Sequence, residues 1–236
     1  MPTTKVKGIV LGGVNVKEKD KLAYLYTLEQ GKMTVSFKGV RGDRAKLKSA
    51  KELFCFGEYE LVGNGNINIV TSCEIIDNFY NLSKDIERYY EACAILDIVN
   101  KVAVESSPPL FIEIIKALKC LCYEKAAKYY VIDKFFLSYF NLSGYHFLSD
   151  RCSSCGARLG KAYFNYDVGE LVCPACRTQS CDAVSEPALS AMKILEQTEY
   201  DSLSSVKLGG QGEIQAFHIL SKNFEWKTGY SVLKLL

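Results

Sequence analysis

Short apolar stretches with strand periodicity occupy the first third of the chain. Five of them follow one another with turn-forming residues between them, at residues 5–11, 22–28, 32–37, 53–62 and 67–75. Runs of this length, rich in β-branched and aromatic residues, are typical of β-strands. Because closure removes exposed strand edges, five such strands without a long helix predict a small closed barrel over residues 1–80. The OB-fold is the leading five-stranded candidate, and an SH3-like barrel is the alternative that strand count leaves open.

Beyond residue 82 the apolar positions recur every three or four residues, which is the spacing of helices that bury one face. Ser83 is suited to cap the first of these helices. The periodic segments are residues 83–104, 110–123, 126–142, 187–197 and 212–226. They predict an all-α helical domain over residues 81–236. The expected fold class is therefore α+β, with an N-terminal OB-fold barrel followed by this helical domain.

Two Cys-x-x-Cys pairs interrupt the helical pattern. Cys152 and Cys155 form the first pair, and Cys173 and Cys176 form the second after seventeen intervening residues. Each pair makes a tight knuckle that directs two sulfurs at one point, and two knuckles complete a tetrahedron around Zn²⁺. Four thiolates leave no open coordination position, so the pattern predicts one structural zinc in an inserted ribbon over residues 150–180. The alternatives are redox pairs, or cysteines packed as small apolar residues.

The residues between the knuckles support a ribbon. Residues 161–166 have the pattern of a strand, 167–169 that of a turn, and 170–172 that of a second strand leading to the second knuckle. Cys181 is a rival ligand in principle, and the knuckle pattern argues against it.

Composition narrows the class of protein further. The chain has 236 residues, is 48% hydrophobic and 24% charged, and carries a formal charge of +2. We expect no membrane segment, because no apolar run approaches the ~20 residues that a span needs. Ten cysteines without an export signal are typical of a reducing compartment, so the expected location is the cytoplasm.

A basic segment stands between the third and fourth predicted strands. It holds six cations against one acid, Asp43; the cations are Lys38, Arg41, Arg44, Lys46, Lys48 and Lys51. On a barrel, such a segment is a candidate for contacts with the phosphates of DNA. The alternative is an ordinary solvated loop. The neighbouring rings of Phe37, Phe54 and Phe56 are candidates for base stacking or, more commonly, for the barrel core.

The sequence contains no recognisable catalytic motif. Metal-dependent phosphoryl chemistry needs clustered carboxylates or histidines, and the two histidines, His146 and His218, lie far apart in sequence without motif partners. No Gly-x-x-x-x-Gly-Lys-Ser/Thr motif for ATP is present. We therefore expect a binding protein without catalytic residues, with a nuclease or thiol oxidoreductase as the rival class.

The order of these parts resembles one family, the bacterial recombination mediator RecO. Its match extends over nearly the whole chain and rests on order and spacing. The matching segments are Thr-Leu-Glu-Gln-Gly-Lys at 27–32, Lys-Gly-Val-Arg at 38–41, Arg-Ala-Lys-Leu at 44–47, the helical residues 92–99 and 137–144, the knuckles with Gly-Glu-Leu-Val at 169–172, and the ending at 230–236.

This resemblance implies binding to single- and double-stranded DNA and annealing of complementary strands. It also implies action with RecR, and in some organisms RecF, to load RecA onto DNA covered by single-strand-binding protein, in association with the bacterial nucleoid. The alternative is a zinc-ribbon transcription or scaffold factor that binds nucleic acid without annealing it.

The resemblance further implies that the helical domain binds the acidic, apolar C-terminal tail of single-strand-binding protein. Such a tail needs an apolar pocket with cations at its edge. We expect the second and third helices to supply the pocket. The tentative edge residues are Lys116, Lys119 and Lys128, with Lys125 and Lys134 as further candidates. The alternative is that the aromatic side chains of these helices are all core.

Overall fold

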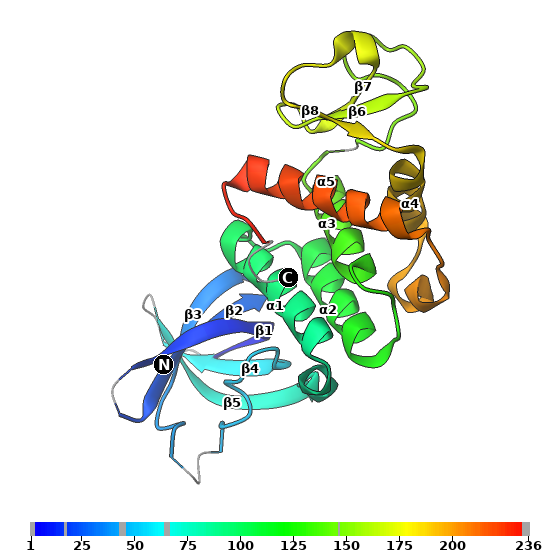
Figure 1. The fold of residues 1–236 in the computed structure, drawn as a ribbon. Coiled ribbons are helices and arrows are strands. Elements are labelled where there is room, and N and C mark those ends of the chain that lie inside the picture. Colours follow the sequence, from blue (N-terminus) through cyan, green and yellow to red (C-terminus); the bar gives the residue numbers. More distant parts are fainter. Residues whose placement is uncertain (1–2, 17, 43–45, 64–66, 146, 233–236) are drawn as a thin grey trace. The chain divides into compact units, whose positions relative to one another are not determined.

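The computed structural model describes residues 3–16, 18–42, 46–63, 67–145 and 147–232 (Figure 1). The chain divides into two compact units. The first consists of residues 1–84 and 95–112, and the second of residues 85–94 and 113–236.

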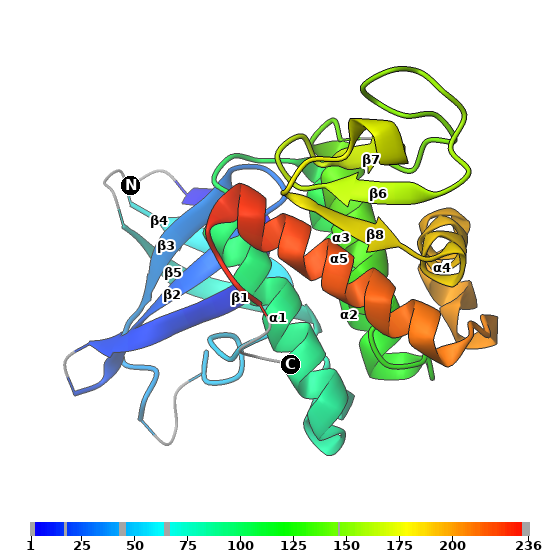
Figure 2. The same ribbon diagram turned by 45° about the horizontal axis from the view of Figure 1, so that its top comes forward.

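Five strands of the first unit form a closed barrel in the order β1-β2-β3-β5-β4 (Figure 2). They are β1 (Thr3–Val16), β2 (Asp20–Thr27), β3 (Gly31–Phe37), β4 (Phe56–Val62) and β5 (Asn68–Asp77). All pairs are antiparallel except β3 with β5, which pair in parallel. This OB-like arrangement confirms the predicted five-stranded barrel.

Alternation along the strands places the barrel core. In β4, Tyr59 and Leu61 point inward and are buried, and Glu60 between them is partly exposed. Strand β1 continues five residues beyond its predicted end, through an irregularity between Val10 and Gly12. A Cβ atom on Gly13 would lie 2.3 Å from the carbonyl oxygen of Leu22, so only glycine permits this approach of β1 and β2.

Residues 103–106 of the first unit pack against the turn between β2 and β3. The amide of Lys32 donates to the carbonyl oxygen of Val104 at 3.0 Å, and the Tyr26 hydroxyl donates to that of Glu105 at 3.2 Å. Gly31 in the turn has a φ of 68°, and a Cβ there would lie 2.4 Å from the carbonyl carbon of Glu105. The turn therefore requires glycine for both conformation and space.

The predicted helical region is also confirmed. Its helices are α1 (Ile86–Val102), α2 (Pro108–Tyr123), α3 (Tyr130–Leu142), α4 (Glu186–Gln197) and α5 (Gly210–Thr228), with 3₁₀ turns η1 (Tyr80–Lys84) and η3 (Tyr200–Ser205). The first helix begins later than predicted, because Ser83 lies in η1 and Asp85 caps instead. The Oδ1 atom of Asp85 accepts from the amide of Arg88 at 3.2 Å.

Helix α3 forms the centre of the second unit. Nine of its thirteen residues are buried. Its aromatic side chains pack against other rings of the same unit: Phe136 lies 5.5 Å from Phe224 of α5, and Phe140 lies 5.8 Å from Phe147. The aromatic stripe of this helix is therefore core.

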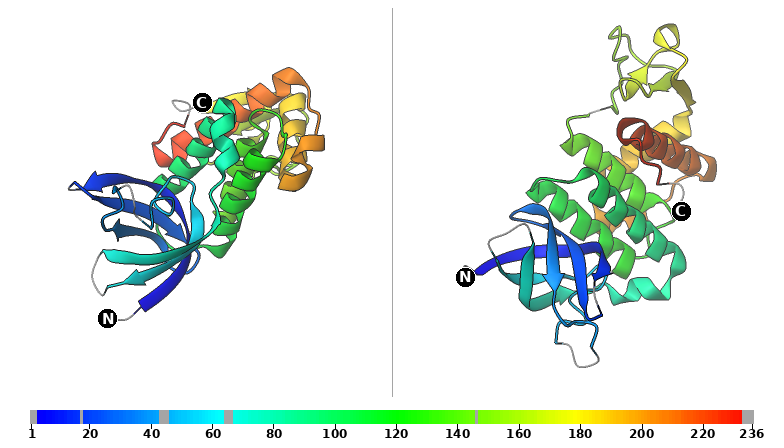
Figure 3. Two further views of the ribbon diagram at one scale, coloured as in Figure 1. Left: turned by 90° about the horizontal axis from the view of Figure 1, so that it is seen from below. Right: turned by 90° about the vertical axis from the view of Figure 1, so that its left-hand side faces the viewer.

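The cysteine-rich insertion, coloured yellow-green in Figure 3, forms a small sheet. Its strand order is β7-β6-β8. Its strands are β6 (Ala162–Asn165), β7 (Glu170–Val172) and β8 (Cys181–Val184), and the 3₁₀ turn η2 (Pro174–Cys176) lies between the last two. The first two strands match the prediction, and β8 was not predicted. Phe164 in β6 is fully buried with its ring edge-on to Phe147 at 5.2 Å, which ties the sheet to the aromatic core of α3.

Candidate functional site

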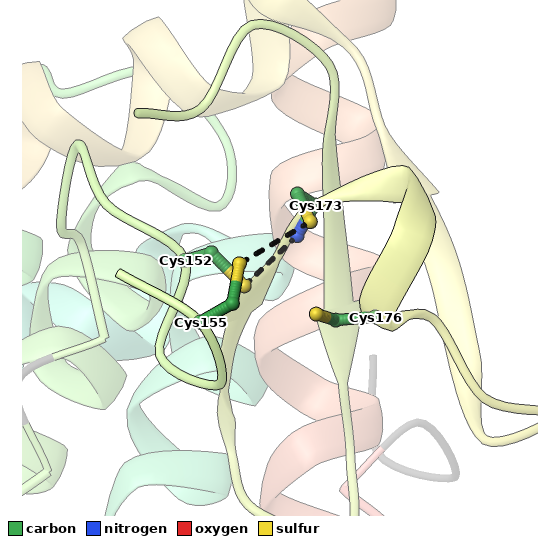
Figure 4. Close-up of side chains that lie close together, drawn as sticks. All are labelled: Cys152, Cys155, Cys173 and Cys176. Atoms are coloured by element: carbon green, nitrogen blue, oxygen red, sulfur yellow. Dashed lines mark hydrogen bonds between the residues drawn. The ribbon is translucent and has the colours of Figure 1, made fainter. Parts of the chain in front are cut away.

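The four predicted cysteine ligands come together at one end of the small sheet. The sulfurs of Cys152, Cys155, Cys173 and Cys176 all lie within 4.8 Å of one another, and the side chains converge (Figure 4). The sulfurs of Cys155 and Cys173 are 3.8 Å apart. A tetrahedron with zinc–sulfur bonds of about 2.3 Å has edges of about 3.8 Å, so donor type and spacing both fit a zinc site.

Local backbone bonds build each knuckle. The amide of Gly156 donates to the carbonyl oxygen of Cys152 at 2.9 Å, and the amide of Cys176 donates to that of Cys173 at 3.0 Å. Gly156 has a φ of 73°, a left-handed conformation that glycine adopts without steric strain. Each Cys-x-x-Cys sequence therefore closes a turn that brings its own two sulfurs together.

The thiolate form of one predicted ligand, Cys152, is stabilised by a hydrogen bond from the other knuckle. The amide of Cys173 donates to the sulfur of Cys152 at 3.3 Å. This hydrogen bond is the main reason that the pKa of Cys152 falls to about 6, against the opposing effect of desolvation. Metals bind thiolates, so the second knuckle stabilises the binding form of a ligand in the first. Cys181 lies outside the cluster, and its sulfur accepts from the amide of Thr178 at 3.2 Å.

The basic segment after β3 is fixed to the barrel by its backbone and its apolar residues. Val40 and Ala50 are buried in the barrel core, and the hydroxyl of Tyr59 donates to the carbonyl oxygen of Ala50 at 3.0 Å. Asp20 accepts from the amide of Gly39 at 2.9 Å. The described residues on either side, 38–42 and 46–51, are therefore attached to the barrel.

The predicted DNA-contact residues differ in their surroundings. Lys38 pairs with Asp20 at 2.9 Å, and Lys51 is mostly buried and pairs with Glu52. Among the other four candidates, Arg41, Lys46 and Lys48 are exposed, and Arg44 lies outside the described residues. The neighbouring rings are core: Phe37 and Phe54 are buried, and Phe56 packs 5.9 Å from Phe111.

Two of the tentative partner-binding residues share one cavity. Lys116 and Lys119 of α2 border a hollow of about 440 Å³, together with the side chains of Tyr123 and Tyr200. The hollow also has acidic residues at its edge, and Lys116 pairs with Glu199 at 3.4 Å. The second helix and η3 therefore supply an apolar hollow with both kinds of charge around it.

The other candidate lysines do not border this hollow. Lys128 does not line the hollow; it pairs with Glu87 at 3.2 Å and lies over the ring of Tyr129. Lys125 is exposed and is also outside the lining. Lys134 is only 9% exposed and donates to the carbonyl oxygen of Glu196, so it cannot form an edge. The third helix turns its aromatic side chains into the core and does not supply the pocket.

Sequence reasoning missed a group of buried carboxyls. Glu91 of α1 accepts from the amide of Ile132 at 3.0 Å, which caps the first turn of α3. Burial raises the pKa of Glu91 to about 7. Asp133 is also buried, and burial raises its pKa well above the ordinary value, with the charges of Glu91 and Glu213 adding to the rise. Acidic residues one turn into a helix are ordinary in sequence, so no local signal reveals this burial.

A second hollow, of about 760 Å³, lies between β8 and α5 of the second unit. Its lining includes Tyr166, Asp182, Lys222, Glu225 and Trp226. Since these residues come from three separate stretches of sequence, only the fold brings them together.

None of the described helices is long and apolar enough to cross a membrane.

Comparisons with known proteins identify the same family in both the N-terminal and the C-terminal part of the chain. The family model "Recombination protein O N terminal" matches residues 1–79, and "Recombination protein O C terminal" matches residues 83–234. A protein named DNA repair protein RecO from Thermoanaerobacter sp. (strain X514) is 28% identical over 214 residues, which cover 89% of this chain and 86% of the relative. Proteins of the same name from Acetivibrio thermocellus and Clostridium novyi are each 26% identical, covering 86% and 92% of this chain and 83% and 86% of the relatives. The chain therefore belongs to the RecO family of DNA repair and recombination proteins.

Proposed function

We propose that this chain is a DNA-binding recombination mediator that anneals complementary single strands and, with RecR, helps to load RecA onto DNA covered by single-strand-binding protein. The observation that carries the proposal is the OB-like barrel with an anchored basic segment, in a member of the RecO family. RecF is a further partner in this scheme. The protein works by binding and positioning strands, without a catalytic residue of its own.

The barrel holds the proposed DNA contacts. Arg41, Lys46 and Lys48 present their side chains to solvent from a segment whose neighbours Val40 and Ala50 are buried. At these positions the arrangement limits the entropy lost when the cations meet phosphates, because the neighbouring residues are already packed in the barrel. Lys38 and Lys51 contribute less, since each already pairs with a carboxylate that competes with phosphate.

Zinc is the metal that we assign to the cysteine cluster. Four thiolates in a tetrahedral arrangement favour Zn²⁺ among the divalent metals of proteins, and they leave no position for water or substrate. The ion would hold Cys152, Cys155, Cys173 and Cys176 together and so fix both knuckles of the sheet. Its role is structural.

The hollow bordered by Lys116 and Lys119 is the proposed site for the acidic tail of single-strand-binding protein. Its apolar surface suits the apolar end of the tail, and the two lysines suit its carboxylates. Glu199 competes for Lys116 at 3.4 Å, so Lys119 is the stronger candidate for a direct charge contact. Binding should weaken with salt because part of it is charge attraction.

A strand-annealing assay tests the proposal most directly. Fluorescent complementary oligonucleotides are mixed with the protein, first bare and then covered by single-strand-binding protein, and duplex formation is followed in time. We expect acceleration by the unaltered chain and a much smaller effect from the Lys46→Ala, Lys48→Ala double variant. The Lys84→Ala, Lys207→Ala double variant, which removes two exposed lysines outside the basic segment, serves as the control for nonspecific charge effects. DNA binding without any acceleration would favour the transcription or scaffold factor instead.

A further inference from the structure

Hydrogen bonds between α5 and the end of β8 hold these two elements together beside the hollow that they line. The side-chain amide of Gln215 on α5 donates to the carbonyl oxygen of Ala183 at 3.0 Å and accepts from the amide of Ser185 at 3.0 Å. Two turns further along α5, Lys222 donates to Asp182 of the same strand, and Figure 2 draws β8 and α5 next to each other. These bonds make the hollow a built feature of the second unit.

Most of the charge inside the hollow is already neutralised. Lys222 donates to Asp182 at 2.6 Å and lies 4.4 Å from the centre of the Tyr166 ring. The Tyr166 hydroxyl donates to the same carboxylate at 2.9 Å. The ammonium group of Lys222 is the main reason that the pKa of Asp182 lies below its ordinary value. Neither Lys222 nor Asp182 is therefore available to bind a ligand strongly.

Two groups of the hollow are left without such partners. The carboxylate of Glu225 makes no ion pair or side-chain hydrogen bond with any residue that the structure describes. Trp226 is 53% exposed, and its ring contact among the described residues is with Tyr166, at 6.1 Å and an angle of 40°. An indole that lines a large hollow with half of its surface in water is uncommon, because tryptophan is mostly buried in folded proteins.

An exposed indole face beside an unneutralised carboxylate suits one chemical group in particular. A guanidinium is planar, stacks on tryptophan by cation–π attraction, and pairs with a carboxylate through two parallel hydrogen bonds. From Gln215 to Trp226 the helix rises about 16 Å, enough for about five residues of an extended peptide. We propose that this hollow binds an arginine side chain in an extended segment of a partner protein, between Trp226 and Glu225.

The charges argue against DNA as the occupant of this hollow. A phosphate would lie near the carboxylates of Asp182 and Glu225, and the cation within reach, Lys222, already pairs with Asp182. The inference is thus separate from the DNA contacts proposed for the barrel.

Trp226 is the sole tryptophan of the chain, so its fluorescence reports on this hollow. The probe is the acetylated and amidated pentapeptide Gly-Ala-Arg-Ala-Gly, and its controls carry glutamine or lysine in place of arginine. Titration into the full-length protein in low salt should change the fluorescence saturably. We expect the arginine peptide to bind most tightly, the lysine peptide more weakly and the glutamine peptide not measurably.

Variants separate the proposed contacts from general effects. Calorimetric titration should give at least about fivefold weaker binding for Glu225→Gln, and about the same loss for Trp226→Ala, with a smaller loss for Trp226→Phe. Glu74→Gln, an equal charge change on the barrel strand β5, should bind as the unaltered protein does, and circular dichroism should confirm that each variant is folded. The proposal is overturned by equal binding of the glutamine and arginine peptides, by Glu225→Gln binding as before, or by no saturable signal up to about 1 mM peptide. Quenching of Trp226 by oligothymidine that displaces the peptide would assign the hollow to DNA instead.

Discussion

Glu91→Gln tests whether one buried carboxyl sets the pH dependence of stability in the second unit. Burial raises the folded-state pKa of Glu91 to about 7 from an ordinary value of 4.5. The folded protein therefore holds this proton more tightly than the unfolded chain does. Its contribution to stability is fully present below about pH 4.5 and is lost as the pH rises through about 7.

The size of the effect follows from the two pKa values. Proton linkage gives a loss of about 2 kcal/mol of unfolding free energy between about pH 5.5 and about pH 8 for this one group. Arg88 and Lys128 oppose the rise in pKa, and the two amides that donate to Glu91 do so as well, so burial is the effect that wins. Asp150 and Asp182, whose pKa values are lowered by Lys193 and Lys222, lose their contributions only at pH values below this window.

Urea unfolding at about pH 5.5 and pH 8, followed by Trp226 fluorescence, measures the effect in the unit that contains Glu91. Glutamine keeps an acceptor for the amide of Ile132 and removes the titration, so the variant should lose about 2 kcal/mol less than the parent across this range. Glu87→Gln is the matched control, because Glu87 lies one turn earlier on α1 and is exposed. It should keep the parental pH dependence.

Identical pH dependence in the parent and in Glu91→Gln would refute the reasoning, since the carboxyl would then not titrate in this range. Asp133→Asn distinguishes the second buried carboxyl from the first. The Oδ1 atom of Asp133 has no hydrogen-bond partner among the described residues. Removal of its charge should therefore stabilise the fold at about pH 8 and have less effect at about pH 5.5.

Three further predictions concern metal, DNA and partner. Elemental analysis should find one zinc per chain, lost in Cys176→Ser and kept in Cys181→Ser, because only the former removes a member of the cluster; zinc loss in Cys181→Ser would refute the ligand set. The Lys46→Ala, Lys48→Ala variant should flatten the slope of log affinity against log salt for single strands by about 1.4. An unchanged slope would mean that Lys46 and Lys48 do not contact phosphates and that the DNA site lies elsewhere. A fluorescent acidic tail peptide should bind the unaltered chain, and it should bind the Lys119→Glu variant at least about tenfold more weakly. Equal anisotropy titrations of the two proteins would exclude the hollow bordered by Lys116 and Lys119 as the tail site.

Those parts of the molecule that short-range sequence determines could be predicted. The strand pattern of the barrel and the periodicity of the helices follow from alternating burial. The cysteine cluster follows because each knuckle is local: Gly156 and the turn at Pro174 close it with their own backbone bonds. Only one longer-range contact is then needed to bring the two knuckles together, and the hairpin of β6 and β7 provides it.

Features that depend on tertiary burial could not be predicted from the local sequence pattern. Lys134 and Lys128 are both lysines on or beside the same predicted helix, yet one is buried and the other exposed. The helical period places Lys134 beside core positions, but a lysine at that register is usually a solvent-facing residue. Its position depends on the carbonyl oxygen of Glu196, which accepts a hydrogen bond from the ammonium group and lies sixty-two residues away in the chain.

Strand β8 also forms only through tertiary contacts. It lines the hollow between β8 and α5, and so it affects what that hollow can bind. Its four residues include one buried apolar side chain, Val184, which is too little for a strand to form alone. Pairing with β6 on one side and the bonds from Gln215 and Lys222 on the other hold it in place. The bond from Lys222 engages the carboxylate of Asp182, and that of Glu225 has no side-chain partner among the residues that the structure describes. The contact that completes the ribbon sheet is thus what gives the hollow its surplus negative charge beside Trp226.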